Sequence, residues 1–354
     1  MKYSSIRIKN FRAIDMLDMR NFKQVNLITG KNNSGKTTLL EALFQISGMS
    51  NPQLPVTINN IRDLVLASDD NFNFVFHNLD FNQEPHISAM LDDSQRTLTI
   101  KPKYAAQYNK KVINTEKINL IAENKTTVND DDFPIINGIL LEFNEGKDKE
   151  SFTSEISLSG NRIRISNRYR EKLRCSFHTP KNSMSMLPQR IEKLLINKQM
   201  DGIIEALDEI DPKIIDIRMG AGGVIYVDIG LDKLLPINIM GDGIRRIFSI
   251  IAAVSDMQGG ILLVDEIENG LHYSTLKTLW KALLKALETY HVQLFATTHS
   301  NECVAALGDS YKEVTQKTDN IRLYRIERQE DNHQIFEYLP EMIVSGIDNN
   351  IEMR

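Results

Sequence analysis

One eight-residue segment constrains this chain more than any other. Residues 30–37 read GKNNSGKT and fit the pattern G-x-x-x-x-G-K-[ST]. An apolar run over 25–29 precedes the segment, and a helical pattern over 37–47 follows it. This strand–loop–helix context is the one that a phosphate-binding loop requires. The sequence therefore predicts a P-loop, and with it a nucleotide-binding α/β fold.

The chemistry of the loop follows from a few of its residues. Gly30 and Gly35 let the backbone turn tightly and direct N–H groups at phosphate oxygens, and the following helix adds its positive dipole end. The Lys36 ammonium is expected to reach the β- and γ-phosphates, and the Thr37 hydroxyl to hold Mg²⁺. An ordinary turn does not require Lys-Thr at this point. The expected ligands are Gly30, Asn32, Asn33, Ser34, Gly35, Lys36, Thr37 and Thr38.

Composition narrows the class of protein. The chain has 354 residues, enough for two domains or for one large domain with an insertion. Its net charge of −5 excludes an overall basic surface for nucleic acid and leaves a local basic patch open. Its two cysteines suit a reducing compartment. No membrane-length apolar run or signal peptide is evident, so we predict a cytoplasmic protein without a membrane partner.

The chain is predicted to hold a discontinuous core with an insertion. Residues 1–50 and 230–354 are expected to form the nucleotide-binding core. Residues 51–229 are expected to form an inserted lobe, β-rich to about residue 175 and helical beyond it. The acidic run 129–132 is expected to be a solvated loop. Further strands are expected at 6–9, 16–19, 86–90 and 97–101 (a hairpin), 139–143, 162–166, 214–219, 224–228, 261–264 and 292–297, and helical stretches at 188–210, 244–254 and 274–290.

Two carboxylates follow the apolar run at 261–264. The run is typical of a central parallel strand, and ligands bind beyond the carboxyl ends of such strands. We therefore expect Asp265 to hold Mg²⁺ and Glu266 to polarise the attacking water. The alternative is a pair of acids that cap the next helix.

A second glycine-rich segment, Gly241-Asp242-Gly243, comes directly before a helical pattern. Glycines at a helix start form an anion site. Because we find one P-loop, we expect this segment to contact the γ-phosphate that another subunit holds. The alternative is a loop with a capping aspartate. Arg245 and Arg246 are either phosphate ligands or solvated helix residues.

Polar residues also follow the strand predicted at 292–297. His299 is expected to bond the γ-phosphate or the attacking water. Ser300 is expected to cap a helix over 301–307, with Gly308 as its stop. His272 is expected either to touch a partner subunit or to cap the next helix.

In this order, the segments resemble ABC-type ATPases, and above all the RecF/SMC-like branch of bacterial AAA-family ATPases related to the overcoming-lysogenization-defect nucleases. The likeness covers about 1–50 and 236–310, including IRIKNFR near the start, MGDG at 240–243, DEIENGLH at 265–272 and TTHS at 297–300. The resemblance implies an α/β P-loop fold with an ABC-type head. It also implies ATP and Mg²⁺, and a head-to-tail homodimer or higher oligomer in which each site joins one P-loop to the other subunit's 241–243 loop.

The chain departs from its relatives in several ways. The 241–243 loop lacks the serine of the transporter signature, and His272 stands where transporters usually have an aspartate. We cannot identify the glutamine that commonly links the two lobes. Only 54 residues follow Ser300, too few for a Toprim nuclease domain. Sustained heptads are absent, which argues against a coiled-coil arm.

The resemblance favours an ATPase that dimerises around ATP and regulates a separate effector, a nuclease or a toxin, in bacterial anti-phage defence. One alternative is a RecF-like DNA-repair ATPase, for which nucleic acid would be a partner. Salt-sensitive DNA binding would favour this alternative. Another is a nucleotide-gated scaffold with little turnover, which phosphate-release assays would identify. A transport-associated ATPase ranks last.

Overall fold

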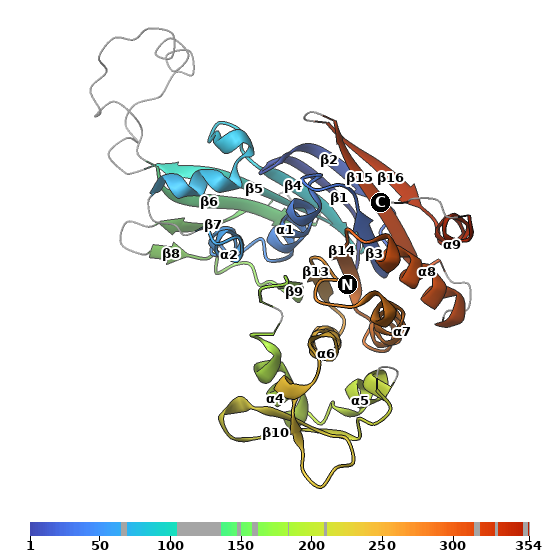
Figure 1. The fold of residues 1–354 in the computed structure, drawn as a ribbon. Helices are drawn as coiled ribbons and strands as arrows, with labels where there is room; N and C mark the ends of the chain where they lie inside the picture. The colour runs from blue at the N-terminus through green and yellow to red at the C-terminus, as the bar shows by residue number, and fades with distance from the viewer. Residues whose placement is uncertain are drawn as a thin grey trace, which may run out of the picture.

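The computed structural model describes residues 1–64, 69–104, 136–146, 150–157, 162–182, 184–208, 211–314, 319–329, 332–349 and 353. One large sheet runs through this part of the chain, with helices on both of its faces (Figure 1). A smaller lobe of helices and short strands lies below the sheet in the same view. The predicted solvated loop at 129–132 lies outside the described residues.

The first half of the large sheet is antiparallel. The predicted hairpin is confirmed, and its β4 strand alternates between half-buried and buried residues because one of its faces packs on the core. Strands from the predicted insertion join the N-terminal strands through the β4–β1 pairing. In spatial order these strands are β8 (Arg162–Arg164), β7 (Phe152–Ser157), β6 (Ile136–Glu145), β5 (Ser94–Tyr104), β4 (His86–Leu91), β1 (Tyr3–Phe11) and β2 (Ile14–Arg20).

The second half of the sheet carries the parallel strands. It continues from β2 through the C-terminal hairpin β16 (Asn332–Tyr338) and β15 (Ile321–Gln329) to β3 (Val25–Thr29), β14 (Gln293–Thr297), β13 (Ile261–Val264) and β9 (Cys175–His178). The strands from β15 to β9 run parallel to one another. The hairpin and β9 have no counterpart in the sequence predictions. The domain boundaries at residues 51 and 229 stay a prediction.

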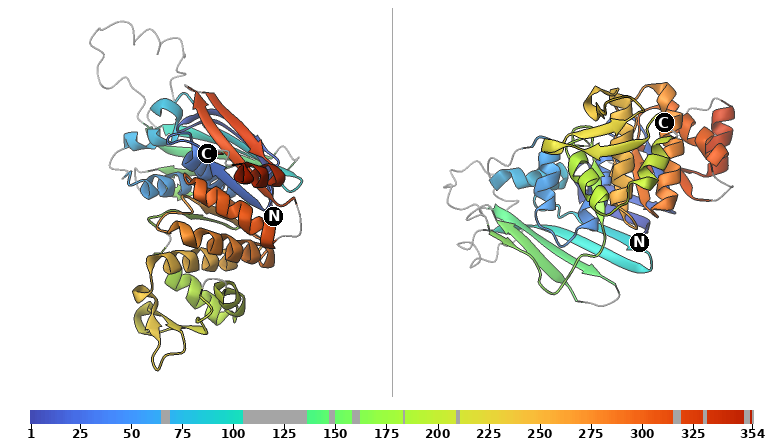
Figure 2. Two further views of the ribbon diagram at one scale, coloured as in Figure 1. Left: turned by 45° about the vertical axis from the view of Figure 1, so that its right-hand side comes forward. Right: turned by 90° about the horizontal axis from the view of Figure 1, so that it is seen from below.

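Side chains of the parallel strands alternate between two hydrophobic cores. In β13, Leu263 faces the core that also holds the apolar face of α1 (Lys36–Ser47). Leu262 faces the opposite core, built with α6 (Asp242–Asp256), α7 (Tyr273–Thr289) and α8 (Asn301–Val314). This period-two alternation places α1 on one face of the sheet and α6 to α8 on the other. Figure 2 shows α6 to α8 away from the green and cyan antiparallel strands.

The small lobe joins β9 to α6. It contains α4 (Leu187–Ile196), α5 (Asp201–Asp208) and a sheet of β10 (Asp216–Met219), β11 (Ile225–Asp228) and β12 (Leu235–Pro236). The last helix in the described part of the chain is α9 (Pro340–Asp348), and α2 (Leu54–Ile61) follows α1. Short 3₁₀ helices are Asp69–Val75, His77–Leu79, Ala221–Gly223 and Ile237–Ile239. Among the described residues, we find no helix with both the length and the apolar character needed to span a membrane.

Two predicted element boundaries are wrong. The helical stretch at 188–210 is two helices, because Lys198 adopts a left-handed backbone conformation (φ 55°) between them. Gly308 does not stop α8, which continues to Val314. A Cβ on Gly308 would lie 2.3 Å from Ile347 Cδ1 of α9. The glycine therefore permits close helix packing rather than ending a helix.

Candidate nucleotide-binding site

The P-loop has the backbone that the sequence predicts. It leaves β3 after Thr29 and enters α1 at Lys36. Gly30 has φ 142°, and a Cβ there would lie 2.3 Å from the carbonyl oxygen of Ile326 in β15. Gly35 has φ 95° at the helix start. Both positions therefore require glycine.

Lys36 is buried within the loop. Its ammonium group donates to the carbonyl oxygens of Gly30 at 2.8 Å and Lys31 at 2.9 Å. Burial lowers the pKa of Lys36 to about 8, an effect that the nearby carboxylates of Asp265 and Glu266 oppose. The Lys36 ammonium group thus lies at the entrance of an anion site. It is bonded to carbonyl oxygens that phosphate oxygens can replace.

Asp265 lies at the carboxyl end of β13, beside the P-loop. The Thr37 hydroxyl donates to its two carboxylate oxygens at 3.1 and 3.0 Å, and the Thr297 hydroxyl donates at 2.6 Å. A hydroxyl and a carboxylate at this spacing fit a hard cation that completes its shell with phosphate and water oxygens, as Mg²⁺ does. Among the described residues, no group of three or more His, Cys, Asp and Glu side chains forms an all-protein metal site.

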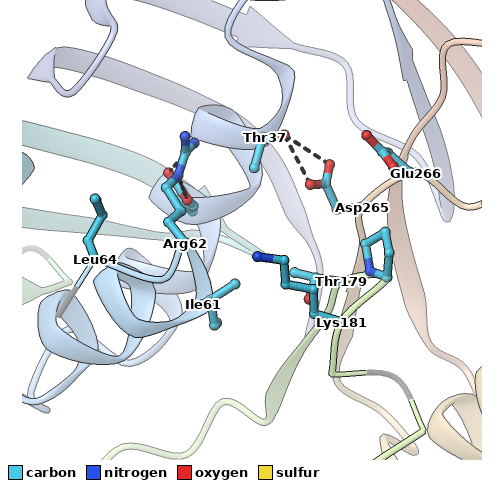
Figure 3. Close-up of a pocket in the computed structure, with 10 residues that line it drawn as sticks. Thr37, Ile61, Arg62, Leu64, Thr179, Lys181, Asp265 and Glu266 are labelled. Carbon is cyan, nitrogen blue, oxygen red and sulfur yellow. Dashed lines mark hydrogen bonds and ion pairs between the residues drawn. The ribbon is translucent and has the colours of Figure 1, made fainter.

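Glu266 adopts a left-handed backbone conformation (φ 47°), uncommon for a residue with a side chain. Its N–H donates to the Thr297 hydroxyl at 2.8 Å. The Asn269 amide donates to its carboxylate at 3.1 Å. These bonds orient Glu266 beside Asp265 and Thr37, as Figure 3 shows. Neither acid caps a helix, because α7 begins only at Tyr273.

Thr37, Asp265 and Glu266 open onto a cavity of about 520 Å³ (Figure 3). Its other wall holds residues that the sequence did not single out. Glu41 is fully buried one turn after Thr37 and accepts two hydrogen bonds from Arg62, at 2.5 and 3.0 Å. Lys181, beyond the end of β9, forms an ion pair with Asp63. The full lining is Thr37, Glu41, Ile61, Arg62, Leu64, Thr179, Pro180, Lys181, Asp265 and Glu266.

His299 follows β14 at the same edge of the sheet. Its N–H donates at 2.7 Å to Glu268, another acid of the segment after β13. The next residue, Ser300, caps α8 as predicted by accepting from the N–H of Cys303 at 3.0 Å. The catalytic role of His299 stays a prediction, although its backbone is tied to the acidic segment.

The sequence predicts that 241–243 precedes a helix, but α6 already begins at Asp242, so Gly241 is its N-cap and Asp242 and Gly243 lie in its first turn. This segment, still called the 241–243 loop below, lies on the side of the sheet opposite α1. A Cβ on Gly241 would meet no atom within 4 Å. The exposed Asp242 pairs with Arg245 at 2.9 Å. Arg246 is not a solvated helix residue: it is buried and donates to the carbonyl of Thr179 at 3.4 Å.

His272 caps α7, which is one of the two roles expected from the sequence. Its ring nitrogen accepts at 3.4 Å from the N–H of Ser274, in the first turn of α7. Its ring also lies 4.3 Å from that of the exposed Tyr273. A contact with a partner subunit stays a prediction.

Comparison with known proteins identifies the family. A family model described as "AAA domain, putative AbiEii toxin, Type IV TA system" matches residues 25–305, more than half of the chain. The chain belongs to this AAA family. The match includes the P-loop, the acids after β13 and His299, and the chain is therefore an ATPase of the AAA type.

Individual relatives agree with this assignment. A Helicobacter pylori protein named ATP/GTP phosphatase is 28% identical over 334 residues, covering 87% of this AAA ATPase and 88% of the relative. A solved SMC head, bound to the C-terminal winged-helix domain of ScpA, superposes with a TM-score of 0.52 at 10% identity. That match covers 96% of this chain and 98% of the other. It confirms the predicted α/β fold with an ABC-type head.

Proposed function

We propose that this AAA ATPase works as a dimer that closes around ATP, with each site shared between two copies. The observation that carries the proposal is the separation of two anion-binding elements within one chain. The P-loop and α1 lie on one face of the parallel sheet, while the 241–243 loop opens α6 on the other. A second copy, turned head to tail, would bring its 241–243 loop to the first copy's P-loop.

Each residue has a role in the proposed reaction. Lys36 neutralises the β- and γ-phosphates, and loop N–H groups bind their oxygens. Thr37 and Asp265 would hold Mg²⁺, which would offset charge on the transferred phosphoryl group. Glu266 accepts a hydrogen bond from the attacking water and orients it, and His299 contacts the γ-phosphate. Gly241, Asp242 and Gly243 of the partner contact the same phosphate from the opposite side.

We further propose that closure regulates a separate effector, a nuclease or a toxin, in anti-phage defence. One finding supports this extension: the family description names a putative toxin of a type IV toxin–antitoxin system. ATP can drive closure because it makes contacts with the partner that exist only in the closed dimer.

The test measures mass and turnover together. We expect Glu266→Gln to abolish phosphate release and to accumulate an ATP-bound dimer in light scattering after gel filtration. Lys36→Ala is expected to stay monomeric with ATP, because it loses the cation that binds the phosphates. Glu288→Gln, the same change at an exposed position near the end of α7, is the matched control and should behave as wild type.

Each result bears on a separate part of the proposal. If the Glu266→Gln protein binds ATP and stays monomeric, the proposed ATP-driven dimer is wrong. The assignment of the chain as an ATPase would not be affected by that result. A Glu266→Gln protein that releases phosphate at the wild-type rate would show that another residue orients the water.

A further inference from the structure

The C-terminal hairpin lies directly beside the P-loop. Its strands β15 and β16 stand between β3, which carries the P-loop, and β2 of the N-terminal strands (Figure 1). The last residue of β3, Thr29, pairs with Arg325, whereas β15 continues to Gln329. The hairpin therefore extends beyond the carboxyl edge of the parallel strands, where the ligands of such sheets bind.

His333 lies on this extension, next to the P-loop. It is in β16, opposite Arg328 of β15. Two positions along the strands, Ile335 and Ile326 pair and pack in the core that also holds α1. Because residues two apart in a strand share a face, His333 also faces the side of α1. A Cβ on Gly35 would lie 3.2 Å from Nε2 and 3.5 Å from Cδ2 of His333, so the edge of the imidazole ring lies against the start of α1.

The acids after β13 give the direction of a bound nucleotide. In the proposed function, Asp265 and Glu266 mark the γ-phosphate end, because Mg²⁺ and the attacking water would lie there. In the sheet, β13 is two strands from β3 on one side, whereas β15 and β16 follow β3 on the other. The N–H groups of the P-loop would hold the α- and β-phosphates between these two sides. The nucleoside would then leave the loop on the side of β15 and β16, where His333 lies.

The aromatic rings of the N-terminal strands are not available to a nucleoside. Tyr3 and Phe11 of β1 are each 1% exposed, and Phe22, which follows β2, is 7% exposed. All three pack in the core that also holds α1. His333 is instead half-buried, and its ring approaches Gly35 by an edge rather than by a face. Of these four rings, that of His333 is the one placed to meet a base.

We propose that His333 stacks on the base of the bound nucleotide. Histidine is among the side chains that stack on bases in nucleic-acid recognition, and the same ring chemistry applies to a free nucleotide. Stacking is tolerant of base identity, because every base has a π-face. His333 therefore adds affinity for the nucleoside without selecting adenine over guanine. This role depends on the nucleotide orientation of the proposed function, but not on closure of a dimer.

The test compares a ligand that carries a nucleoside with one that lacks it. Calorimetric titration measures the dissociation constants of ADP, GDP and inorganic pyrophosphate, each with Mg²⁺. None of these ligands has a γ-phosphate, so their binding does not depend on the proposed ATP-driven dimer. We expect His333→Ala to weaken ADP and GDP binding about tenfold each, and to leave pyrophosphate binding unchanged within about twofold.

Further variants separate stacking from hydrogen bonding. His333→Phe keeps an aromatic ring and should bind ADP within about threefold of wild type. His333→Gln keeps hydrogen-bonding groups without the ring and should lose as much affinity as His333→Ala. Gln334→Ala changes the exposed neighbour on the other face of β16; it is the matched control and should bind all three ligands as wild type does. Melting curves establish that each variant is folded.

Several outcomes would overturn the role of His333. Equal losses of ADP and pyrophosphate in His333→Ala would show that the ring shapes the P-loop and does not contact the nucleoside. Recovery by glutamine and not by phenylalanine would replace stacking with a hydrogen bond, as would a loss for ADP that GDP does not share. Unchanged ADP binding in His333→Ala would place the base elsewhere and would leave the P-loop and the dimer proposal standing.

Discussion

Lys36 can bond either to carbonyl oxygens of the P-loop or to phosphate oxygens of a nucleotide. In the structure its ammonium group bonds to the carbonyl oxygens of Gly30 and Lys31, both in the loop that would surround a phosphate. Burial lowers the pKa of Lys36 to about 8. Phosphate binding requires the charged form, and the phosphate charge in turn stabilises that form. Binding and protonation of this lysine are therefore coupled.

The coupling predicts how ATP affinity depends on pH. Below pH 8 Lys36 is already charged, so affinity should be nearly constant. Above pH 8 a proton must be taken up on binding, and affinity should fall by up to about tenfold per pH unit. Calorimetric titration between pH 7 and 9.5 measures the change. Lys36→Arg keeps its charge throughout this range and should bind with a flat profile. The same slope in both proteins would assign the effect to another group.

Helix packing at the C-terminal end of the chain gives a second, independent test. Gly308 lies inside α8, where alanine would normally add about 1 kcal/mol of stability. Its position against Ile347 Cδ1 reverses this expectation, because overpacking costs about 1–3 kcal/mol. We expect Gly308→Ala to lower the midpoint of urea unfolding. Ile347→Val removes Cδ1, so the double variant should recover stability. A Gly308→Ala protein more stable than wild type would contradict this packing argument.

Elements with local sequence signals could be predicted, and elements that depend on distant pairing could not. The P-loop and the strand before Asp265 were predictable because glycine requirements, caps and apolar runs are local properties. The strand β9 was missed because its four residues become a strand only through pairing with β13, far along the chain. Thr179 and Lys181 were missed with it. Arg62 had no local signal, since its role depends on the buried Glu41.

At the scale of the molecule, the sheet separates α1, which follows the P-loop, from α6, which follows Gly241. The P-loop, Thr37 and the acids after β13 gather at the carboxyl edge of the parallel strands. The 241–243 loop starts a helix that packs on the other core. If two copies share each site, a defect in the P-loop of one copy and a defect in the 241–243 loop of the other should spoil the same site and leave the second one intact.

Mixed dimers test this arrangement. Gly241→Glu should fold normally, because the position has φ −55° and open space around an added Cβ, yet it places a negative charge where the partner's γ-phosphate would dock. Gly241→Glu and Lys36→Ala are each expected to be inactive alone. Mixed in equal amounts, they should recover turnover, up to about half of the wild-type value, because neither variant closes with itself and each mixed dimer has one intact site of two. Lys36→Ala mixed with Glu266→Gln should recover nothing, because both defects lie on the P-loop side of the interface and every site in the mixed dimer keeps one of them. Recovery in both mixtures, or in neither, would contradict a site shared between copies.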